Sequence, residues 1–171
     1  MRREFIGLIV AVLIVLGLVG GFISYNYWPI LTGQKIVLDT RPVDPFDPFR
    51  GQYMTIGYEI SWIDNVTGFE QGDNIYVSLD EDDEGVWRYE GTSKSKPKGD
   101  FIKGEVERAY DNRVSVRYGV EQFFFERNAK VPTENITVEV AVASSGRAKF
   151  VQMLQNGKPI EIEYGDFDIR R

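Results

Sequence analysis

An uncharged apolar run from Phe5 to Trp28 constrains this chain more than any other feature of its sequence. A helix of about 24 residues is about 36 Å long, which is enough to cross a hydrocarbon core of about 30 Å with some tilt. The apolar core of a cleaved signal peptide is shorter, at about 7–15 residues. We therefore expect residues 1–28 to form a short cytoplasmic segment and an uncleaved transmembrane anchor, with residues 5–28 in the lipid bilayer.

The charges that flank this run predict its orientation. Arg2 and Arg3 come just before it, and the next basic residue is Lys35. The positive-inside rule then places the N-terminus in the cytoplasm and the rest of the chain outside. Two alternatives stay open: a signal peptide cleaved at the small residues of 19–21, and a pilin-like subunit, although the short leader and the glutamate that pilins carry are absent.

Composition excludes several kinds of site. The chain has no cysteine and no histidine, so it lacks thiol nucleophiles, disulfides, thiolate metal sites and the commonest general base. The net charge is −6, whereas a nucleic-acid partner requires a basic face. Residues are 43% hydrophobic and 13% aromatic, which is unlike a disordered chain. We expect a folded domain with no metal, no cofactor and no nucleic-acid partner.

Alternation with a period of two predicts β-strands after the anchor. Such alternation runs from Tyr53 to Ile60 and is typical of a strand with one buried face. Further strands are expected at 35–40, 75–79, 86–90, 101–109, 114–118 and 120–125. With a linker at 29–34, the sequence predicts one β-domain over 35–171. Its predicted fold class is all-β, as a small antiparallel sandwich or a partly open barrel.

The C-terminal part predicts a meander. Valines occupy positions 138, 140 and 142, and Ile160, Ile162 and Tyr164 repeat this alternation. Two segments between these runs contain turn residues, Ser144–Gly146 and Asn156–Gly157. Asn-Gly is the strongest short signal for a type I′ hairpin turn. We therefore expect consecutive antiparallel strands here.

A proline-rich loop precedes the strand at 53–60. Prolines recur every three residues at 42, 45 and 48, which is the period of a polyproline II helix without internal hydrogen bonds. Asp44 and Asp47 share this spacing, so both carboxylates lie along one edge within reach of Arg50. Gly51 then allows backbone angles that other residues avoid. We expect Arg50 to pair with one of these aspartates and to hold the loop.

The residues that follow resemble a known family. Gly51, Tyr53 and Tyr58 match the GDYXXLXY signature, whereas Gln52 replaces its aspartate and Ile56 its leucine. The wider match comprises a VDPxDxFRG loop at 43–51, a YGVEQFF stretch at 118–124 and a GRA…GKPI segment at 146–160. The chain is thus similar to the GDYXXLXY family of membrane-anchored bacterial and archaeal proteins.

This resemblance implies a location and a general role. Family members look like extracytoplasmic β-domains, often encoded beside multi-pass membrane proteins. The resemblance therefore implies an accessory or interaction module with a membrane-protein partner, in the cytoplasmic or plasma membrane of a prokaryote. It transfers no catalytic residue. The expected motif and loop residues are Asp44, Asp47, Arg50, Gly51, Tyr53 and Tyr58.

A membrane-anchored hydrolase is the alternative function. Asp44 and Asp47 are a candidate carboxylate pair, and Gly72–Asp80 resembles the GDNxxxSxD box of type I signal peptidases, which use a Ser-Lys pair. However, the chain has no Ser-Met pair, and no lysine lies between Lys35 and Lys94. A turn that opens a strand is the simpler interpretation of Gly72–Asp80.

Three further patterns occur in the sequence. Asp80–Gly85 imitates the start of a calcium loop, but its twelfth position is Gly91 instead of glutamate, so we expect a hairpin tip. Asn65 and Asn135 each begin an N-glycosylation pattern, which matters only in a host that glycosylates exported proteins. The three phenylalanines of 123–125 must point to both faces of a strand, which favours core packing over a partner surface.

Overall fold

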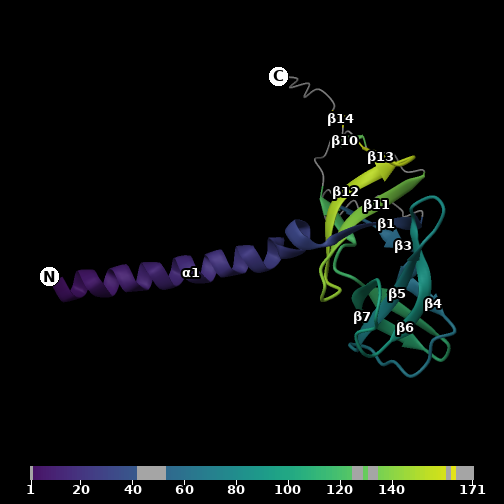
Figure 1. Ribbon diagram of the computed structural model, residues 1–171, viewed down its shortest axis with the longest axis horizontal. Helices are drawn as coiled ribbons and strands as arrows, with labels where there is room; N and C mark the ends of the chain where they lie inside the picture. The colour runs from purple at the N-terminus through teal and green to yellow at the C-terminus, as the bar shows by residue number, and fades with distance from the viewer. Residues whose placement is uncertain (1, 42–52, 125–128, 131–134, 161–162, 165–171) are drawn as a thin grey trace, which may run out of the picture.

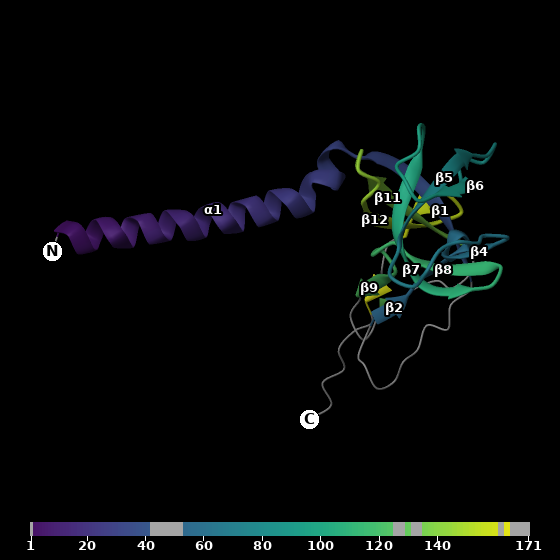
Figure 2. The same ribbon diagram turned by 90° about the horizontal axis from the view of Figure 1, so that it is seen from below.

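The computed structural model describes residues 2–41, 53–124, 129–130, 135–160 and 163–164 of the chain. It consists of one long N-terminal helix and a domain of strands (Figure 1). The helix projects away from the strands in both perpendicular views (Figures 1 and 2). Within the described residues, the domain contacts the helix at the C-terminal end of the helix.

Helix α1 (Arg2–Thr32) contains a long apolar run in which isoleucine, valine and glycine, moderate or poor helix formers, are common. A helix still suits this run because it satisfies its own backbone hydrogen bonds in an apolar environment. Its segment Phe5–Thr32 is long and apolar enough to cross a membrane. Most large apolar side chains of this segment are more than half exposed, including Phe22 at 70%. The part of the domain that the structure describes leaves this apolar surface uncovered, and such a large apolar surface indicates contact with another apolar environment.

The connection between helix and domain is shorter than expected. We expect a linker at 29–34, but the helix continues through Pro29 to Thr32, and β1 (Gln34–Arg41) begins two residues later. The Gly33 N–H donates to the Pro29 carbonyl at 2.8 Å and closes the last helical turn. A Cβ on Gly33 would lie 2.2 Å from that carbonyl oxygen. Only glycine therefore permits this direct junction.

The remaining elements are short. In chain order they are β2 (Tyr53–Thr55), β3 (Gly57–Tyr58), the 3-10 helix η1 (Glu59–Ser61), β4 (Trp62–Asp64), β5 (Asn74–Glu81), β6 (Trp87–Ser93), β7 (Phe101–Tyr110), β8 (Arg113–Arg117), β9 (Gln122–Phe124), β10 (Ala129–Lys130), β11 (Ile136–Val142), β12 (Ala148–Gln155), β13 (Lys158–Pro159) and β14 (Glu163–Tyr164). Strands occur at each of the six further predicted positions, within a few residues at each end.

The main sheet curls into a half-barrel (Figure 2). Its strand order is β13-β12-β11-β1-β6-β5-β7-β8-β4, and β3 adds to β1. This confirms the all-β prediction in its partly open barrel form. One pairing is parallel, between Leu38 of β1 and Trp87 of β6. The chain between these two strands is long enough for the crossover that parallel pairing requires.

The strand expected at 53–60 is interrupted. Its burial alternation is as predicted, with Ile56, Tyr58 and Ile60 all buried. However, β2 pairs with β9, whereas β3 pairs with β1, so the segment changes partner between them. η1 follows, where the Ser61 hydroxyl accepts a hydrogen bond from the Tyr58 N–H at 3.2 Å. The change of partner and this local turn prevent one continuous strand.

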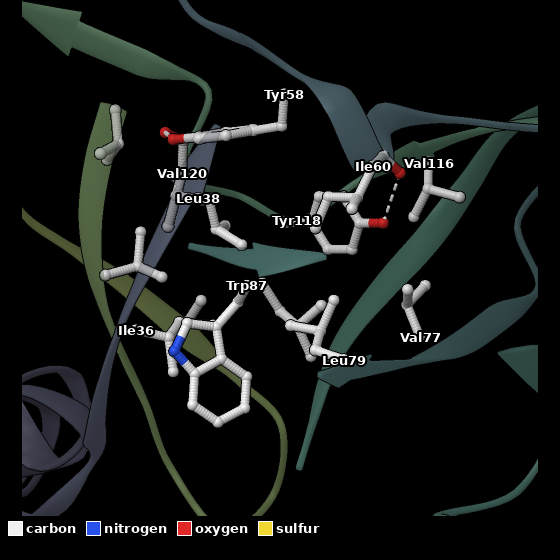
Figure 3. Packing of buried hydrophobic residues seen from close by; sticks show 14 of the residues in the cluster. Ile36, Leu38, Tyr58, Ile60, Val77, Leu79, Trp87, Val116, Tyr118 and Val120 are labelled. Carbon is white, nitrogen blue, oxygen red and sulfur yellow. Dashed lines mark hydrogen bonds between the residues drawn. The ribbon is translucent and has the colours of Figure 1, made fainter. Parts of the chain in front are cut away.

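The core lies inside the curl. Ile36, Leu38, Leu79 and Trp87 pack together there, next to Tyr118 (Figure 3). Leu38 is only 1% exposed, and burying such a side chain stabilises a fold by about 1.5–3 kcal/mol. Because these residues come from β1, β5, β6 and the end of β8, the core joins both halves of the sheet.

The C-terminal meander is confirmed for β11, β12 and β13, which pair antiparallel in sequence order. Asn156 and Gly157 have φ values of 51° and 74°, both positive, as a type I′ turn requires. Ile160 packs against the core. The predicted continuation through Ile162 lies outside the described residues.

Candidate functional site

Two segments that are separate in the sequence meet in the structure. β2 of the signature segment pairs with β9, so that Tyr53 lies opposite Phe124. Just beyond β2, the Ile56 N–H donates to the Glu121 carbonyl at 2.6 Å. Residues 53–58 of the signature and the 118–124 stretch therefore form one unit, which we call the signature unit.

Two buried tyrosines tie the signature unit together. Tyr58 is fully buried, and its hydroxyl donates to the Val120 carbonyl at 2.7 Å. Tyr118 is 6% exposed and donates to the Ile60 carbonyl at 2.7 Å (Figure 3). Each segment thus supplies one hydroxyl donor to the backbone of the other. An unpaired buried carbonyl would cost about 1–3 kcal/mol, so both tyrosines are structural.

The protonation of these tyrosines supports the same conclusion. Burial raises the pKa of Tyr58 and of Tyr118 far above the ordinary value for a phenol, and the charge of Glu121 adds to this effect. Both hydroxyls therefore keep their protons at physiological pH. A general acid or base works best with a pKa near the operating pH, so neither tyrosine fits that role.

Glu121 holds the loop between β8 and β9. One carboxylate oxygen accepts from the Tyr118 N–H, and the other accepts from the Gly119 N–H at 2.9 Å. Gly119 has a φ of 80°, a conformation that favours glycine. The acidic side chain therefore satisfies two backbone donors in a turn that would otherwise leave them unpaired.

A groove of about 640 Å³ lies beside the signature unit. Its walls include Ile56, Trp62, Arg108, Arg117 and Glu121. Within the part of the chain that the structure describes, no three acidic side chains are grouped closely enough to hold a metal ion. The groove therefore offers mixed charges beside a tryptophan.

A larger cavity of about 930 Å³ lies where the helix meets the domain. We call it the junction cavity. Ser24, Tyr25 and Trp28 line it from the helix. The domain contributes Asn74, Tyr76, Lys96, Lys103, Gly104, Glu105, Arg117, Tyr118, Gly119, Ala143, Ser144, Ser145 and Arg147. Arg117 and Gly119 also line the groove beside the signature unit, so the two hollows are neighbours.

Arg147 fastens the helix to the domain. Pro29 has no N–H, so it cannot donate to the Tyr25 carbonyl four residues earlier as other helical residues do. A guanidinium nitrogen of Arg147 donates to that carbonyl instead, and the group lies 3.7 Å from the centre of the Tyr25 ring. Arg147 therefore replaces the hydrogen bond that Pro29 removes, and it stacks on the same residue.

The junction cavity is basic although the whole chain is acidic. Four basic residues line it, Lys96, Lys103, Arg117 and Arg147, against one acidic residue, Glu105. Ser144 and Ser145 lie in the same cavity, yet in the described residues no hydrogen bond joins a serine hydroxyl to a lysine ammonium group. The arrangement favours binding of an anion over Ser-Lys catalysis.

Most of the predicted loop residues lie outside the described residues. Asp44, Asp47, Arg50 and Gly51 are all in this group, so the pairing expected for Arg50 stays a prediction. Tyr53 is placed by its backbone in β2. Of the six predicted residues, Tyr58 is the one whose side-chain contacts are described.

Asn65 and Asn135 both lie exposed on the surface. Their φ values are 59° and 53°, the left-handed conformation that asparagine tolerates better than most residues. This gives each asparagine a conformational role in a turn, and the use of either one for glycosylation stays a prediction. Phe125 lies outside the described residues, and Phe123 and Phe124 are placed in β9.

The segment Asp80–Gly85 forms a hairpin tip between β5 and β6, as expected. One carboxylate oxygen of Asp82 accepts from the N–H groups of Glu84 and Val86, each at 2.9 Å. The bond from Val86, followed by the one from Arg88, lowers the pKa of Asp82. Gly72–Asp80 is likewise a turn that leads into β5. Both segments are therefore structural.

Arg88 is a central residue that sequence reasoning missed. Its guanidinium contacts Asp39 at 2.8 Å, Glu59 at 2.5 Å and Asp82 at 2.9 Å. These carboxylates come from β1, η1 and the β5–β6 hairpin, so no local pattern links them. Arg147 was missed for the same reason, because its partner Tyr25 lies 122 residues earlier.

Comparison with known proteins identifies a family. The GDYXXLXY protein family matches residues 15–153, which is most of the chain. The match includes the C-terminal half of the helix, the signature unit and most of the β11–β12 hairpin. No curated protein and no solved structure matches the chain.

Proposed function

The chain belongs to the GDYXXLXY protein family, and from this premise we propose that it is a membrane-anchored accessory domain that docks on a multi-pass membrane protein. In this proposal the helix spans the bilayer, the N-terminus is cytoplasmic and the β-domain lies outside. The observation that carries it is the rigid junction between helix and domain.

A flexible tether would let the domain rotate freely above the membrane. Here Gly33 alone separates α1 from β1, and Arg147 binds the backbone and the ring of Tyr25. Pro29, at the same junction, is buried. The domain therefore keeps one orientation relative to its helix. A fixed orientation lowers the entropy lost when the domain and the helix contact the same partner at once.

The helix also has a surface suited to a neighbouring helix. Gly17, Gly20 and Gly21 lie in its outer half, and a Cβ on any of them would meet nothing within 4 Å. Gly17 and Gly21 are four residues apart and so share one face. Small residues at this spacing let transmembrane helices approach closely. This face supports packing on the partner within the bilayer.

Cysteine cross-linking tests the docking, because the chain has no cysteine of its own. Gly21→Cys in the full chain is expected to cross-link to a multi-pass membrane protein in native membranes. Val19→Cys is the matched control, since it lies at similar depth but about 200° around the helix. Equal cross-linking from both positions, or none from Gly21→Cys, would contradict a specific helix contact.

Orientation and anchoring are tested with a third variant. Asp83 lies exposed at the β5–β6 hairpin tip, so Asp83→Cys is expected to react with a membrane-impermeant maleimide on intact cells. The protein is expected to stay in the membrane fraction after alkaline extraction. Labelling only after cell lysis would reverse the proposed orientation, and a soluble species that starts near Phe22 would show cleavage.

A further inference from the structure

We propose that the junction cavity binds the phosphate group of an anionic phospholipid, an inference that rests on the membrane anchoring proposed above. The cavity combines uncompensated positive charge, unused hydrogen-bond donors and a position at the depth of lipid headgroups.

The depth follows from the length of the helix. A hydrocarbon core of about 30 Å takes up about 20 helical residues, so a span that starts near Phe5 leaves it near Tyr25. Tyr25 and Trp28, at 66% and 57% exposed, then lie at the headgroup level, where such amphipathic rings are enriched. Both residues line the junction cavity. The cavity therefore lies beside the phosphates of the bilayer.

The positive charge of the cavity is largely unpaired. Lys96 lies with its ammonium group 5.5 Å from the centre of the Phe101 ring, and Lys103 lies 5.9 Å from that of Tyr76. In the described part of the chain, neither lysine has a carboxylate within ion-pair distance. Of the cavity's basic residues, Arg117 contacts the one acidic residue, Glu105, at 3.4 Å. This charge is available to attract an anion.

One cavity residue also has a hydrogen-bond donor without a partner, and backbone contacts hold the cavity wall in place. The Nε of Arg147 is buried and has no hydrogen-bond partner among the described residues, which is unusual for a buried polar atom. The Lys103 N–H donates to the Gly146 carbonyl at 2.8 Å, so β7 and the β11–β12 turn are joined across the cavity. Gly146, with a φ of 84°, has no space for a side chain. The walls are therefore preformed.

A lipid fits this site better than a free phosphate ion. The volume of about 930 Å³ is far larger than one phosphate requires, and the cavity wall continues from charged strands onto the apolar helix. A headgroup phosphate would contact the lysines and Arg147, while the acyl chains would lie along the helix. The signature unit already uses its own donors internally, so it does not compete for this role.

Native mass spectrometry of the full-length protein in mild detergent tests the proposal. We expect phosphatidylglycerol to be retained and phosphatidylcholine with the same acyl chains to be lost. The double variant Lys96→Ala with Lys103→Ala is expected to weaken phosphatidylglycerol binding about 25-fold, at roughly fivefold for each lysine. Lys149→Ala with Lys158→Ala removes the same charge outside the cavity and is expected to leave binding unchanged.

Three results would overturn the inference. These are equal retention of both lipids, equal weakening by the two double variants, and displacement of phosphatidylglycerol by millimolar inorganic phosphate, which would show a free-anion site. Lys103→Arg, which keeps the charge, is expected to retain binding. If the wild-type protein does not bind phosphatidylglycerol but stays in the membrane fraction after alkaline extraction, this inference alone is refuted. Release of the wild-type protein by alkali would refute the anchoring.

Discussion

The signature unit and the junction cavity are neighbours, because the groove beside the unit shares Arg117 and Gly119 with the cavity, yet they differ in chemistry. In the signature unit, Tyr58 and Tyr118 are buried and bonded to backbone carbonyls. In the junction cavity, Lys96 and Lys103 have no carboxylate partner among the described residues, and a buried donor of Arg147 is unpaired.

This difference shows that the residues which identify the family and those with unsatisfied binding capacity are separate. The signature unit joins the two halves of the curled sheet, so its residues are needed for folding. The junction cavity lies between the domain and the candidate membrane span, and its two lysines have no carboxylate partner among the described residues. Substitutions in the two regions should therefore affect different measurements.

The largest effect is expected from Tyr58→Ala. Removing a fully buried aromatic side chain leaves a cavity and an unpaired Val120 carbonyl, and should lower the free energy of unfolding by about 3–5 kcal/mol. This loss is measured by urea titration of the full chain in mild detergent, with tryptophan fluorescence as the signal of unfolding. Tyr110→Ala is the control, since Tyr110 is 53% exposed. Equal losses from the two variants would remove the structural role assigned to Tyr58.

Arg50→Ala tests whether the proline-rich loop belongs with the signature unit. If Arg50 pairs with Asp44 or Asp47, its removal leaves an acceptor without a charged donor and costs about 1–3 kcal/mol. The same urea titration measures this change in the free energy of unfolding. Unchanged stability with loss of the membrane partner would instead make the loop a binding surface. If neither stability nor partner capture changes, both interpretations of Arg50 are wrong.

Tyr118→Phe removes one hydroxyl and is expected to cost about 1–2 kcal/mol at neutral pH, because the Ile60 carbonyl loses its donor. The raised pKa of Tyr118 also has a pH signature. Its stabilising contribution is complete below the pKa of an unfolded tyrosine, about 10, and falls as the pH rises above that value. The variant should therefore lose less stability than the wild type between pH 9 and pH 11. Parallel pH curves would contradict this assignment.

The smallest effect on stability is expected from the junction cavity. Lys96→Ala with Lys103→Ala should change the free energy of unfolding by no more than about 0.5 kcal/mol per residue, because neither lysine has an ion pair in the described residues. The measurement is again urea titration without added lipid. A loss comparable to that of Tyr118→Phe would show that the cavity lysines support the fold, and the contrast between the two regions would fail.

The sequence alone determined the features that depend on neighbours in the chain. The candidate membrane span follows from uncharged length, and most strands follow from alternation. The Asn156–Gly157 turn follows from a dipeptide that favours its backbone angles. The burial of Ile56, Tyr58 and Ile60 was also predictable, because the period-two pattern places them on one face. The family could be identified because its motif is contiguous.

Only the tertiary structure decided which distant segments meet. The strand at 53–60 is interrupted because β2 pairs with β9 and β3 pairs with β1. The residues of this segment do not predict either partner. Arg88 gathers carboxylates from three segments, and Arg147 reaches back to the carbonyl that Pro29 leaves free. Contacts of this kind depend on the curl of the sheet, which arises from all strands together. The junction cavity exists only because that curl sets basic strands against the end of an apolar helix.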